Sequence, residues 1–409
     1  MQTKGTSVPR IAWKEFLPAL IVVFNSLVWY ALTYDRWSKA IIGMEAPAGE
    51  TFIIFGFYYT AIACSGIVGA VFLEKKRRLV FVLWMLIGAV VTATLTTVPN
   101  NSVAVNVLIS IFLGIASGIG LPSCFACFGD ATVVENRGIH GGIAWATIGL
   151  GILALGLVVQ EAVLFLAFGV LALWRMLGLI AFVLSSRNLR EIPRTQRSSS
   201  FLSILHRREV VLYLVPWIMF SLINFTEAPI LERVFGNLYT LVGFVEFAIT
   251  GLFALVGGLL ADRVGRKRIV ITGFIFLGIE YALLSLFSDV PITWYMYTVF
   301  DGVAWGMFAS VFFMTLWGDL AGDRSKEKYY VLGGLPYFLG GFLPILVRPY
   351  ANMIQTGTAF SLASFFLFLA VLPLMYAPET LPEKAMRQRE LEKYVGEAKK
   401  IKEKSKSKN

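Results

Sequence analysis

The chain has 409 residues, of which 57% are apolar and 15% charged, and its mean hydropathy is +0.72. Since a soluble domain carries about 25% charged residues, this composition excludes a soluble globular protein. The formal net charge of +10 would fit a nucleic-acid partner, but the placement of the charges, described below, argues against one.

Apolar residues occur in blocks of roughly 18 or more, the length that a helix needs to cross a hydrocarbon core about 30 Å thick. Lipid offers no hydrogen-bond partners, so spans must be helices or closed barrels, and continuous apolar runs favour helices. In chain order we expect twelve spans, at about 16–34, 52–73, 79–98, 103–128, 143–160, 162–184, 210–231, 238–260, 269–287, 293–317, 331–354 and 358–376. The sequence therefore predicts an all-α membrane protein.

Lysine and arginine lie mostly on one side of these spans. If the N-terminus is cytoplasmic, 31 of the 36 basic residues fall in inside segments. Three lie in outside loops (Arg36, Lys39 and Arg233) and two within spans (Arg175 and Arg348). This asymmetry follows the positive-inside rule, so we expect a multi-pass protein of the cell membrane with cytoplasmic N- and C-termini and no nucleic-acid partner. The first apolar stretch lacks a small-residue cleavage site, and we expect it to remain as span one.

The second half of the chain repeats the first at an offset of about 188 residues. Residues 56–62 match residues 243–249 in a Gly-Phe-x-x-x-Ala-Ile pattern, and Gly-Asp pairs end spans four and ten at 129–130 and 318–319. Matches in the same order predict two pseudo-symmetric six-helix bundles. The expected organisation is a cytoplasmic N-terminus (1–15), an N-terminal bundle (16–184), a cytoplasmic linker (185–209), a C-terminal bundle (210–376) and a basic cytoplasmic tail (377–409).

The tail carries apolar residues at helical spacing among lysines and arginines. Such a helix is a candidate for lying on an anionic inner leaflet, and a solvated helix is the alternative.

Residues 258–268 read Gly-Leu-Leu-Ala-Asp-Arg-Val-Gly-Arg-Lys-Arg and directly follow an apolar run. This segment resembles the signature loop of the major facilitator superfamily of secondary transporters. The resemblance implies two parallel six-helix repeats around a central cavity, with spans one, four, seven and ten facing it, and transport by alternating access. The matching positions are Gly258, Leu260, Ala261, Asp262, Arg263, Gly265, Arg266, Lys267 and Arg268.

The resemblance also implies that Asp262 docks across the interface between the halves and holds a cytoplasmic gate shut. A carboxylate at the end of one helix can accept hydrogen bonds from the unpaired N–H groups that begin another. By symmetry we expect Asp262 to face the start of span five near Arg137, and Glu74 to face the start of span eleven near Arg324. The alternative is that these charges only set topology. The candidate gate residues are Glu74, Arg137, Gly258, Asp262, Arg263, Gly265, Arg266 and Arg324.

Spans seven, eight, ten and eleven contain ionisable residues. Because each costs roughly 2.5–3.5 kcal/mol to insert at a helix centre, such residues indicate a structural pair or a functional site. The residues are Glu227, Glu246, Asp301 and Arg348, and one arginine cannot neutralise three acids. An unpaired acid in a low dielectric favours its neutral form and can carry a proton. Asp301 is the leading candidate for proton coupling, and a structural pair between Arg348 and a carboxylate is the alternative.

Amide and aromatic side chains near mid-depth suit a partly polar organic solute. The candidates on cavity-type helices are Asn25, Trp29, Tyr30, Asn224 and Trp305, and packing is the alternative role for the aromatic residues.

Two short elements bear on the subfamily. Pro378-Glu379-Thr380 resembles the Pro-Glu-Thr that follows the last span of sugar porters. Drug antiporters of the superfamily carry an arginine where this chain has Ser110, with Thr298 as the repeat position, which weakens proton-driven drug efflux as the function.

We therefore expect a transporter that moves a small organic solute by alternating access, coupled to protons, as a monomer. The alternatives are an uncoupled facilitator, a multidrug efflux pump of the same fold and, remotely, a non-transporting receptor. No nucleophile–base pair or phosphate loop indicates an enzyme, and the three cysteines and two histidines indicate neither a metal site nor a cofactor.

Overall fold

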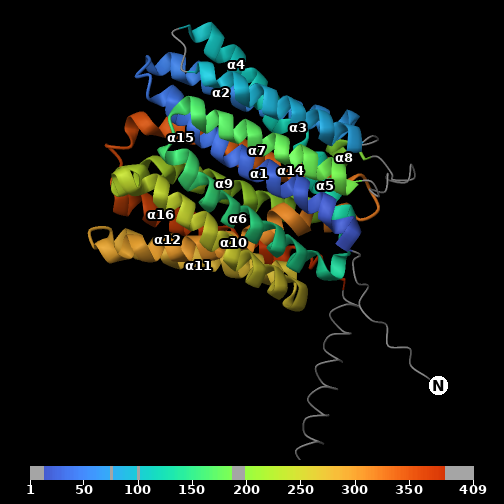
Figure 1. Ribbon diagram of the computed structural model, residues 1–409. Coiled ribbons are helices and arrows are strands. Elements are labelled where there is room, and N and C mark those ends of the chain that lie inside the picture. The colour runs from blue at the N-terminus through green and yellow to red at the C-terminus, as the bar shows by residue number, and fades with distance from the viewer. Residues whose placement is uncertain (1–12, 74–76, 99–101, 187–198, 383–409) are drawn as a thin grey trace, which may run out of the picture.

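The computed structural model describes residues 13–73, 77–98, 102–186 and 199–382. Within these residues the chain is helical and holds no strand. Figure 1 shows the helices running side by side along the long axis of the molecule. Helices α2, α3 and α4, in blue to cyan, lie at one side, and α10, α11 and α12, in yellow to orange, lie at the other (Figure 1).

The helices of the first half are α1 (Trp13–Ile42), α2 (Ala48–Phe72), α3 (Arg77–Thr94), α4 (Val103–Gly118), α5 (Leu121–Asp130), α6 (Arg137–Glu161) and α7 (Leu164–Ser185). A short helix, α8 (Phe201–Leu205), precedes the second half. There the helices are α9 (Arg208–Phe235), α10 (Tyr239–Val264), α11 (Arg266–Phe287), α12 (Pro291–Phe308), α13 (Leu316–Ala321), α14 (Lys326–Gly340), α15 (Leu343–Val347), α16 (Thr356–Leu369) and α17 (Val371–Tyr376). A π-helical stretch, η6 (Ala309–Thr315), joins α12 to α13.

The described helices contain the twelve membrane spans that the sequence predicts. Eleven segments meet the length and hydropathy requirements, and one of them, Arg208–Val264, is 57 residues long. That segment is broken at Gly236, whose φ of +51° ends α9, so it contains two spans. The all-α fold class with twelve transmembrane helices in two bundles is confirmed.

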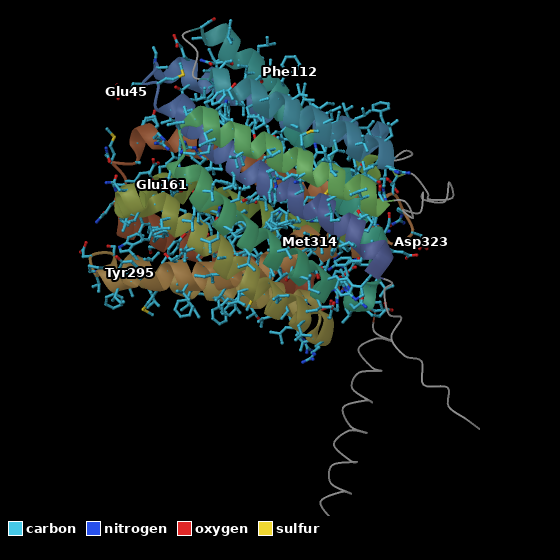
Figure 2. The ribbon with its side chains drawn as sticks, viewed as in Figure 1. Glu45, Phe112, Glu161, Tyr295, Met314 and Asp323 are labelled. Carbon is cyan, nitrogen blue, oxygen red and sulfur yellow. The ribbon has the colours of Figure 1, made fainter. Side chains whose placement is uncertain are left out.

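The outer surface of the helices is apolar. Large apolar side chains such as Phe112 and Leu173 are more than half exposed, where a soluble protein would place polar residues. Figure 2 shows Phe112 at the periphery of the molecule. This surface is what a helix bundle presents to lipid tails.

The helix bundle has two ends, which differ in the residues that they carry. Helix α1 begins and α17 ends at one end, called the terminal end, where Asp323 also lies (Figure 2). Glu45, Glu161 and Tyr295 lie at the other end, called the opposite end (Figure 2).

Helix α1 is longer than the predicted span 16–34, because its final turns are held by polar contacts. The Lys39 ammonium pairs with Asp35 one turn earlier at 2.8 Å. The Arg36 guanidinium donates to the carbonyls of Gln160 and Ala162 at the end of α6, at 3.2 and 2.8 Å. Arg36 and Lys39 therefore lie in a helix and not in the predicted outside loop.

The halves meet most extensively between α6 and α10, and also where α14 packs on α2 and α5 and where η6 packs on α6. The approach of α10 to α6 is close enough to exclude a side chain at Gly258. A Cβ atom there would lie 2.1 Å from the carbonyl oxygen of Gly138. Small residues at such a crossing let helix backbones touch, which is the usual way that membrane helices associate.

Candidate gate and binding cavity

A buried carboxylate joins the halves at the terminal end. Asp319, in α13 of the second half, forms an ion pair with Arg137 at the start of α6 in the first half. Its other oxygen accepts from Nε of Arg266, at the start of α11, at 3.1 Å. The Arg137 guanidinium also donates to the carbonyl of Gly129 at 2.8 Å and to the hydroxyl of Thr132 at 3.1 Å. One carboxylate thus holds an arginine from each half.

The first half contains the equivalent arrangement 189 positions earlier in the sequence. Asp130, at the end of α5, accepts from Arg77 of its own half at 2.6 Å and pairs with Lys326, at the start of α14 in the second half. Each residue of this group thus has an equivalent 189 positions away in the other group. Arg77 corresponds to Arg266, Asp130 to Asp319, and Lys326 to Arg137. A further carboxylate of the second half, Glu327, pairs with Arg77 and accepts from its Nε at 3.0 Å.

Asp262 makes the second kind of bridge between the halves. Its two carboxylate oxygens accept from the backbone N–H groups of Gly138 and Ile139, at 2.9 and 2.8 Å, in the first turn of α6. Those N–H groups have no partner within their own helix, and the positive end of the helix dipole favours an anion there. Arg266 lies 3.0 Å from the same carboxylate, which ties Asp262 to the Asp319 pair.

The turn that follows Asp262 is held by Glu379. Gly265 has a φ of +107°, and a Cβ atom there would lie 2.2 Å from a carboxylate oxygen of Glu379. That carboxylate accepts from the backbone N–H groups of Arg266 and Lys267, at 2.8 and 3.2 Å, and so caps α11. Glu379 belongs to the Pro-Glu-Thr element that resembles sugar porters, and its structural part is to fix this turn.

Several predicted gate residues lie elsewhere. Glu74 lies outside the described residues. Arg324 donates to the hydroxyl of Tyr329 at 3.4 Å and does not join the bridges, because Lys326, two residues later, reaches Asp130 instead. Arg263 is exposed. Sequence reasoning missed five residues of these bridges, Arg77, Asp130, Asp319, Lys326 and Glu327, although the repeated Gly-Asp pairs were the signal for two of them.

An aromatic layer lies on the inner side of these bridges. Phe125 of α5 stacks on Tyr330 of α14 with ring centroids 5.7 Å apart. Trp145 of α6 contacts Phe313 in the π-helical stretch at 5.4 Å. Each contact joins one half to the other, so rings as well as ion pairs close the terminal end.

Two adjoining cavities lie between the halves on the other side of this layer. The smaller has a volume of about 250 Å³ and lies among α1, α6, α9, α10 and α12. The larger, of about 610 Å³, extends toward the opposite end and includes Tyr30, Tyr59 and Arg348 in its lining. Tyr239 and Phe225 line both cavities.

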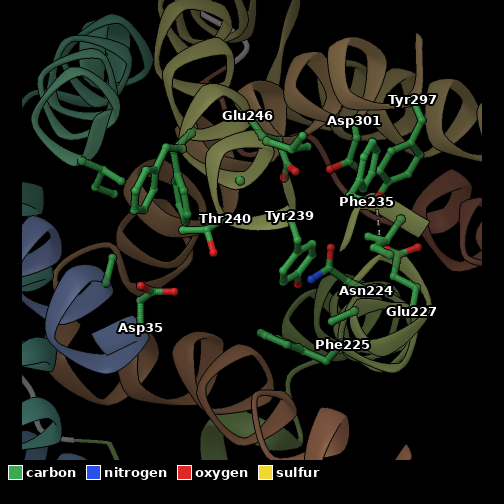
Figure 3. A pocket seen from close by; sticks show the side chains of 18 of the residues that line it. Asp35, Asn224, Phe225, Glu227, Phe235, Tyr239, Thr240, Glu246, Tyr297 and Asp301 are labelled. Atoms are coloured by element: carbon green, nitrogen blue, oxygen red, sulfur yellow. Dashed lines mark hydrogen bonds between the residues drawn. The ribbon is translucent and has the colours of Figure 1, made fainter. Parts of the chain in front are cut away.

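The smaller cavity brings together most of the predicted coupling residues of the second half. Asn224, Glu227, Glu246 and Asp301 all line it, and Figure 3 shows the carboxyl groups of Glu246 and Asp301 pointing toward one another. One oxygen of Glu227 accepts from the Tyr297 hydroxyl at 3.2 Å. The other oxygen of Glu227 and one oxygen of Asp301 are buried and have no hydrogen-bond partner.

Arg348 does not neutralise these acids. Its guanidinium pairs with Glu232 at 2.7 Å near the opposite end, where both side chains are well exposed. The expected alternative, a pair of Arg348 with one of the three buried carboxylates, is therefore absent from the structure. Trp305 donates from its indole N–H to Asn224 at 3.2 Å, which places it behind the cavity lining.

Asn25 and Trp29 do not reach either cavity. Both are buried against α7 and α3 inside the first half, where the Asn25 amide donates to the carbonyl of Trp174 at 2.8 Å and accepts from Arg175 at 3.0 Å. The Arg175 guanidinium lies over the rings of Trp29 and Trp84, at 4.6 and 4.5 Å. The sequence located these residues at a plausible depth, but the face of span one that carries them turns away from the cavity.

Known proteins share this fold. The family model for the Major Facilitator Superfamily matches residues 16–321. An MFS-type transporter of Aspergillus flavus, aprT, is 28% identical over 160 residues, which are 36% of this chain and 31% of that protein, so the chain spans about a third of its length. The solved structure of the proton:xylose symporter XylE bound to 6-bromo-6-deoxy-D-glucose matches 91% of this chain and 97% of its own, with a TM-score of 0.67 and 14% identity. The chain belongs to the Major Facilitator Superfamily and is a multi-pass membrane protein.

Proposed function

We propose that this protein is a secondary transporter that moves a small organic solute by alternating access. One observation carries the proposal: the halves are joined at the terminal end by two carboxylate–cation pairs, that of the buried Asp319 and that of Asp130, and a cavity lies between the halves beyond these pairs. A barrier made of reversible polar contacts, with a binding cavity on its far side, is one of the two states that alternating access requires.

In this proposal the terminal end faces the cytoplasm, as the distribution of lysine and arginine favours. The N-terminal bundle (16–184) and the C-terminal bundle (210–376) move against one another, with 185–209 as their linker. The protein functions as a monomer in the cell membrane.

The gate opens when Asp319 and Asp130 each lose their cation in the other half, and when Asp262 releases the start of α6. Each separated group must then find water or a new partner, because an unpaired buried charge costs several kcal/mol. Opening at the terminal end therefore has to be compensated by new contacts at the opposite end. This compensation couples the two ends.

Proton coupling is assigned to Asp301, with Glu246 and Glu227 beside it. No cation compensates these carboxyl groups in the described part of the cavity, so they favour the protonated state until something positive approaches. Pairing of Arg348 with Glu232 supports coupling over the uncoupled facilitator, which would favour acids locked in ion pairs. A small solute and protons are the expected partners.

The test begins with a screen of small solutes for thermal stabilisation of the purified protein. Stabilising solutes are then offered to proteoliposomes that contain a pH-sensitive dye. We expect transport to change the internal pH, and Asp301→Asn to abolish that change. Transport that leaves the pH unchanged and survives Asp301→Asn would contradict coupling through Asp301.

A further inference from the structure

The charges around the two cavities do not balance. In the larger cavity each cation is paired, Lys39 with Asp35 at 2.8 Å and Arg348 with Glu232 at 2.7 Å. In the smaller cavity three further carboxyl groups remain, and none of its described lining residues is lysine, arginine or histidine. Those carboxyl groups belong to Glu227, Glu246 and Asp301.

Two of the three acids have an oxygen without any partner. The side chains of Glu227 and Asp301 are 6% and 1% exposed, and each leaves one buried oxygen unbonded. Because the great majority of buried polar atoms are satisfied, such atoms in a cavity wall indicate a missing ligand. An acceptor-only carboxylate requires a donor or a positive charge.

The remaining lining of the smaller cavity is mainly aromatic and aliphatic. Phe225, Phe235, Phe244, Phe247, Tyr239 and Tyr297 surround it, and Figure 3 shows the rings of Phe225, Tyr239 and Tyr297 around the acids. Aromatic faces attract organic cations, and quaternary ammonium groups in particular. A neutral polyol would need many hydrogen-bond donors and acceptors. Among the described lining residues, these are, besides the acids and tyrosines, only Asn224 and Thr240.

A metal ion is a poorer occupant. Among the described residues no three histidine, cysteine, aspartate or glutamate side chains are grouped in a geometry that could hold one. The cavity also has a volume of about 250 Å³, far larger than a bare ion needs and suited to a small organic molecule.

We propose that the cavity between α9, α10 and α12 binds an organic cation, an ammonium group on a small apolar body, and that this cation displaces protons from the carboxyl groups of Glu246, Asp301 and Glu227. The inference rests on the proposed function and names its substrate class. With the cavity empty, the acids keep their protons and no charge is buried. When the cation enters, protons leave to the solution, and the carboxylates and aromatic rings compensate its charge.

Other titratable groups face this site from every helix packed against it. They are Asp35 and Lys39 on α1, Glu232 on α9, Tyr239 on α10, Glu280 and Tyr281 on α11, Tyr297 on α12 and Arg348 beyond α15. Asp35, Lys39, Glu232 and Arg348 form the two ion pairs described above. Glu280 is also buried without a hydrogen-bond partner, but it does not line the cavity. The acids that line the cavity are therefore the groups that a bound cation contacts, and acidification weakens cation binding.

The test uses the purified full chain and a pair of matched probes. Choline carries a permanent charge that pH does not change, and 3,3-dimethyl-1-butanol has the same shape without the charge. Phenyltrimethylammonium extends the pair with an aromatic ring, and D-xylose represents neutral sugars. Binding is measured by calorimetry at pH 5.5 and pH 8, in two buffers of different ionisation enthalpy so that proton release is counted.

We expect at least one of the two cations to bind, with affinity that is greater at pH 8 than at pH 5.5 and with release of protons. Asp301→Asn and Glu246→Gln should each weaken that binding roughly tenfold or more, the loss of one charge-assisted contact. Glu161→Gln, at the exposed end of α6 in Figure 2, removes a carboxylate outside the cavity and should leave binding unchanged. The use of two cavity variants keeps the test valid if one of them fails to fold.

The outcomes separate this inference from the proposed function. Equal binding of choline and its neutral isostere, binding without proton release, or binding of neither cation would overturn the inference. If D-xylose then moved into proteoliposomes, the transporter proposal would stand with a neutral substrate. If no solute moved and the two ends of the protein never changed their separation, the proposed function itself would fail.

Discussion

Asp130 and Asp319 lie 189 positions apart in the sequence, and each holds an arginine of its own half together with a cation of the other half. The pseudo-symmetry of the repeat thus extends from the helices to the ion pairs between them. The terminal end is therefore held by two equivalent carboxylate–cation bridges between the halves, and each bridge can be tested separately.

Replacing Asp319 by asparagine should open the terminal end. The change leaves the buried Arg137 without its anion, while Arg266 keeps Asp262 at 3.0 Å, and the closed state loses about 3–5 kcal/mol. Cys127, one turn before Asp130, reports the opening in a background where the other two cysteines are serine. We expect its labelling by a water-soluble maleimide to accelerate tenfold or more, about 1.4 kcal/mol of that cost. Asp323→Asn, an exposed change at the same end, is the control, and equal rates in both variants would contradict the gate.

Replacing Asp262 by asparagine should weaken the closed state by removing one of two acceptors for the N–H groups of Gly138 and Ile139. The amide also places a donor against those donors and lacks the charge that the helix dipole favours, a loss of roughly 1–3 kcal/mol. We expect a lower melting temperature and slower transport. Unaltered transport in this variant would remove Asp262 from the gate.

Replacing Gly258 by alanine should disturb the seam between α10 and α6, because the new Cβ would lie 2.1 Å from a backbone oxygen. Overpacking of this kind costs about 1–3 kcal/mol, so the melting temperature of the detergent-solubilised protein should fall. Gly243→Ala in the same helix is the matched control, since nothing lies within 4 Å of a Cβ atom there. A similar effect of the two alanines would show that the seam is not close-packed.

Replacing Arg175 by lysine should destabilise the first half while retaining the charge. The guanidinium stacks between Trp29 and Trp84 and donates to Asn25, which a lysine ammonium cannot reproduce. We expect a loss of about 1–2 kcal/mol, seen as a lower melting temperature, with no change in cation binding. A binding defect in a fully stable Arg175→Lys protein would place this residue in the transport path.

The sequence predicted the helices well because lipid imposes a length and a composition on every span. The sequence also indicated that Asp262 faces the start of α6, because the motif and the repeat together define how far along its helix each residue lies. The sequence could not define which face of a helix points toward the cavity. Asn25 and Trp29 were therefore predicted as cavity residues, and a pair of Arg348 with one of the buried acids stayed open as an alternative.

The same limit explains the missed gate residues. Asp130 and Asp319 were visible as repeated Gly-Asp pairs, but their partners Lys326 and Arg137 lie in the opposite half. Such a contact depends on how the two halves pack, which no local pattern encodes. Glu232 and its partner Arg348 belong to the same half, but no local pattern relates a residue of α9 to one that follows α15.

Alternating access predicts that the two ends of the protein move in opposite directions. Spin labels at Leu184 and Val264 would report the separation of the halves at the terminal end, and labels at Glu45 and Tyr295 would report the opposite end. Each pair of labels is attached to cysteines introduced into a protein whose own cysteines are replaced. Pulsed electron paramagnetic resonance then measures both separations, with and without Asp319→Asn. We expect the terminal pair to lengthen and the opposite pair to shorten in the variant. Two distance distributions that stay unchanged, or that lengthen together, would contradict the account.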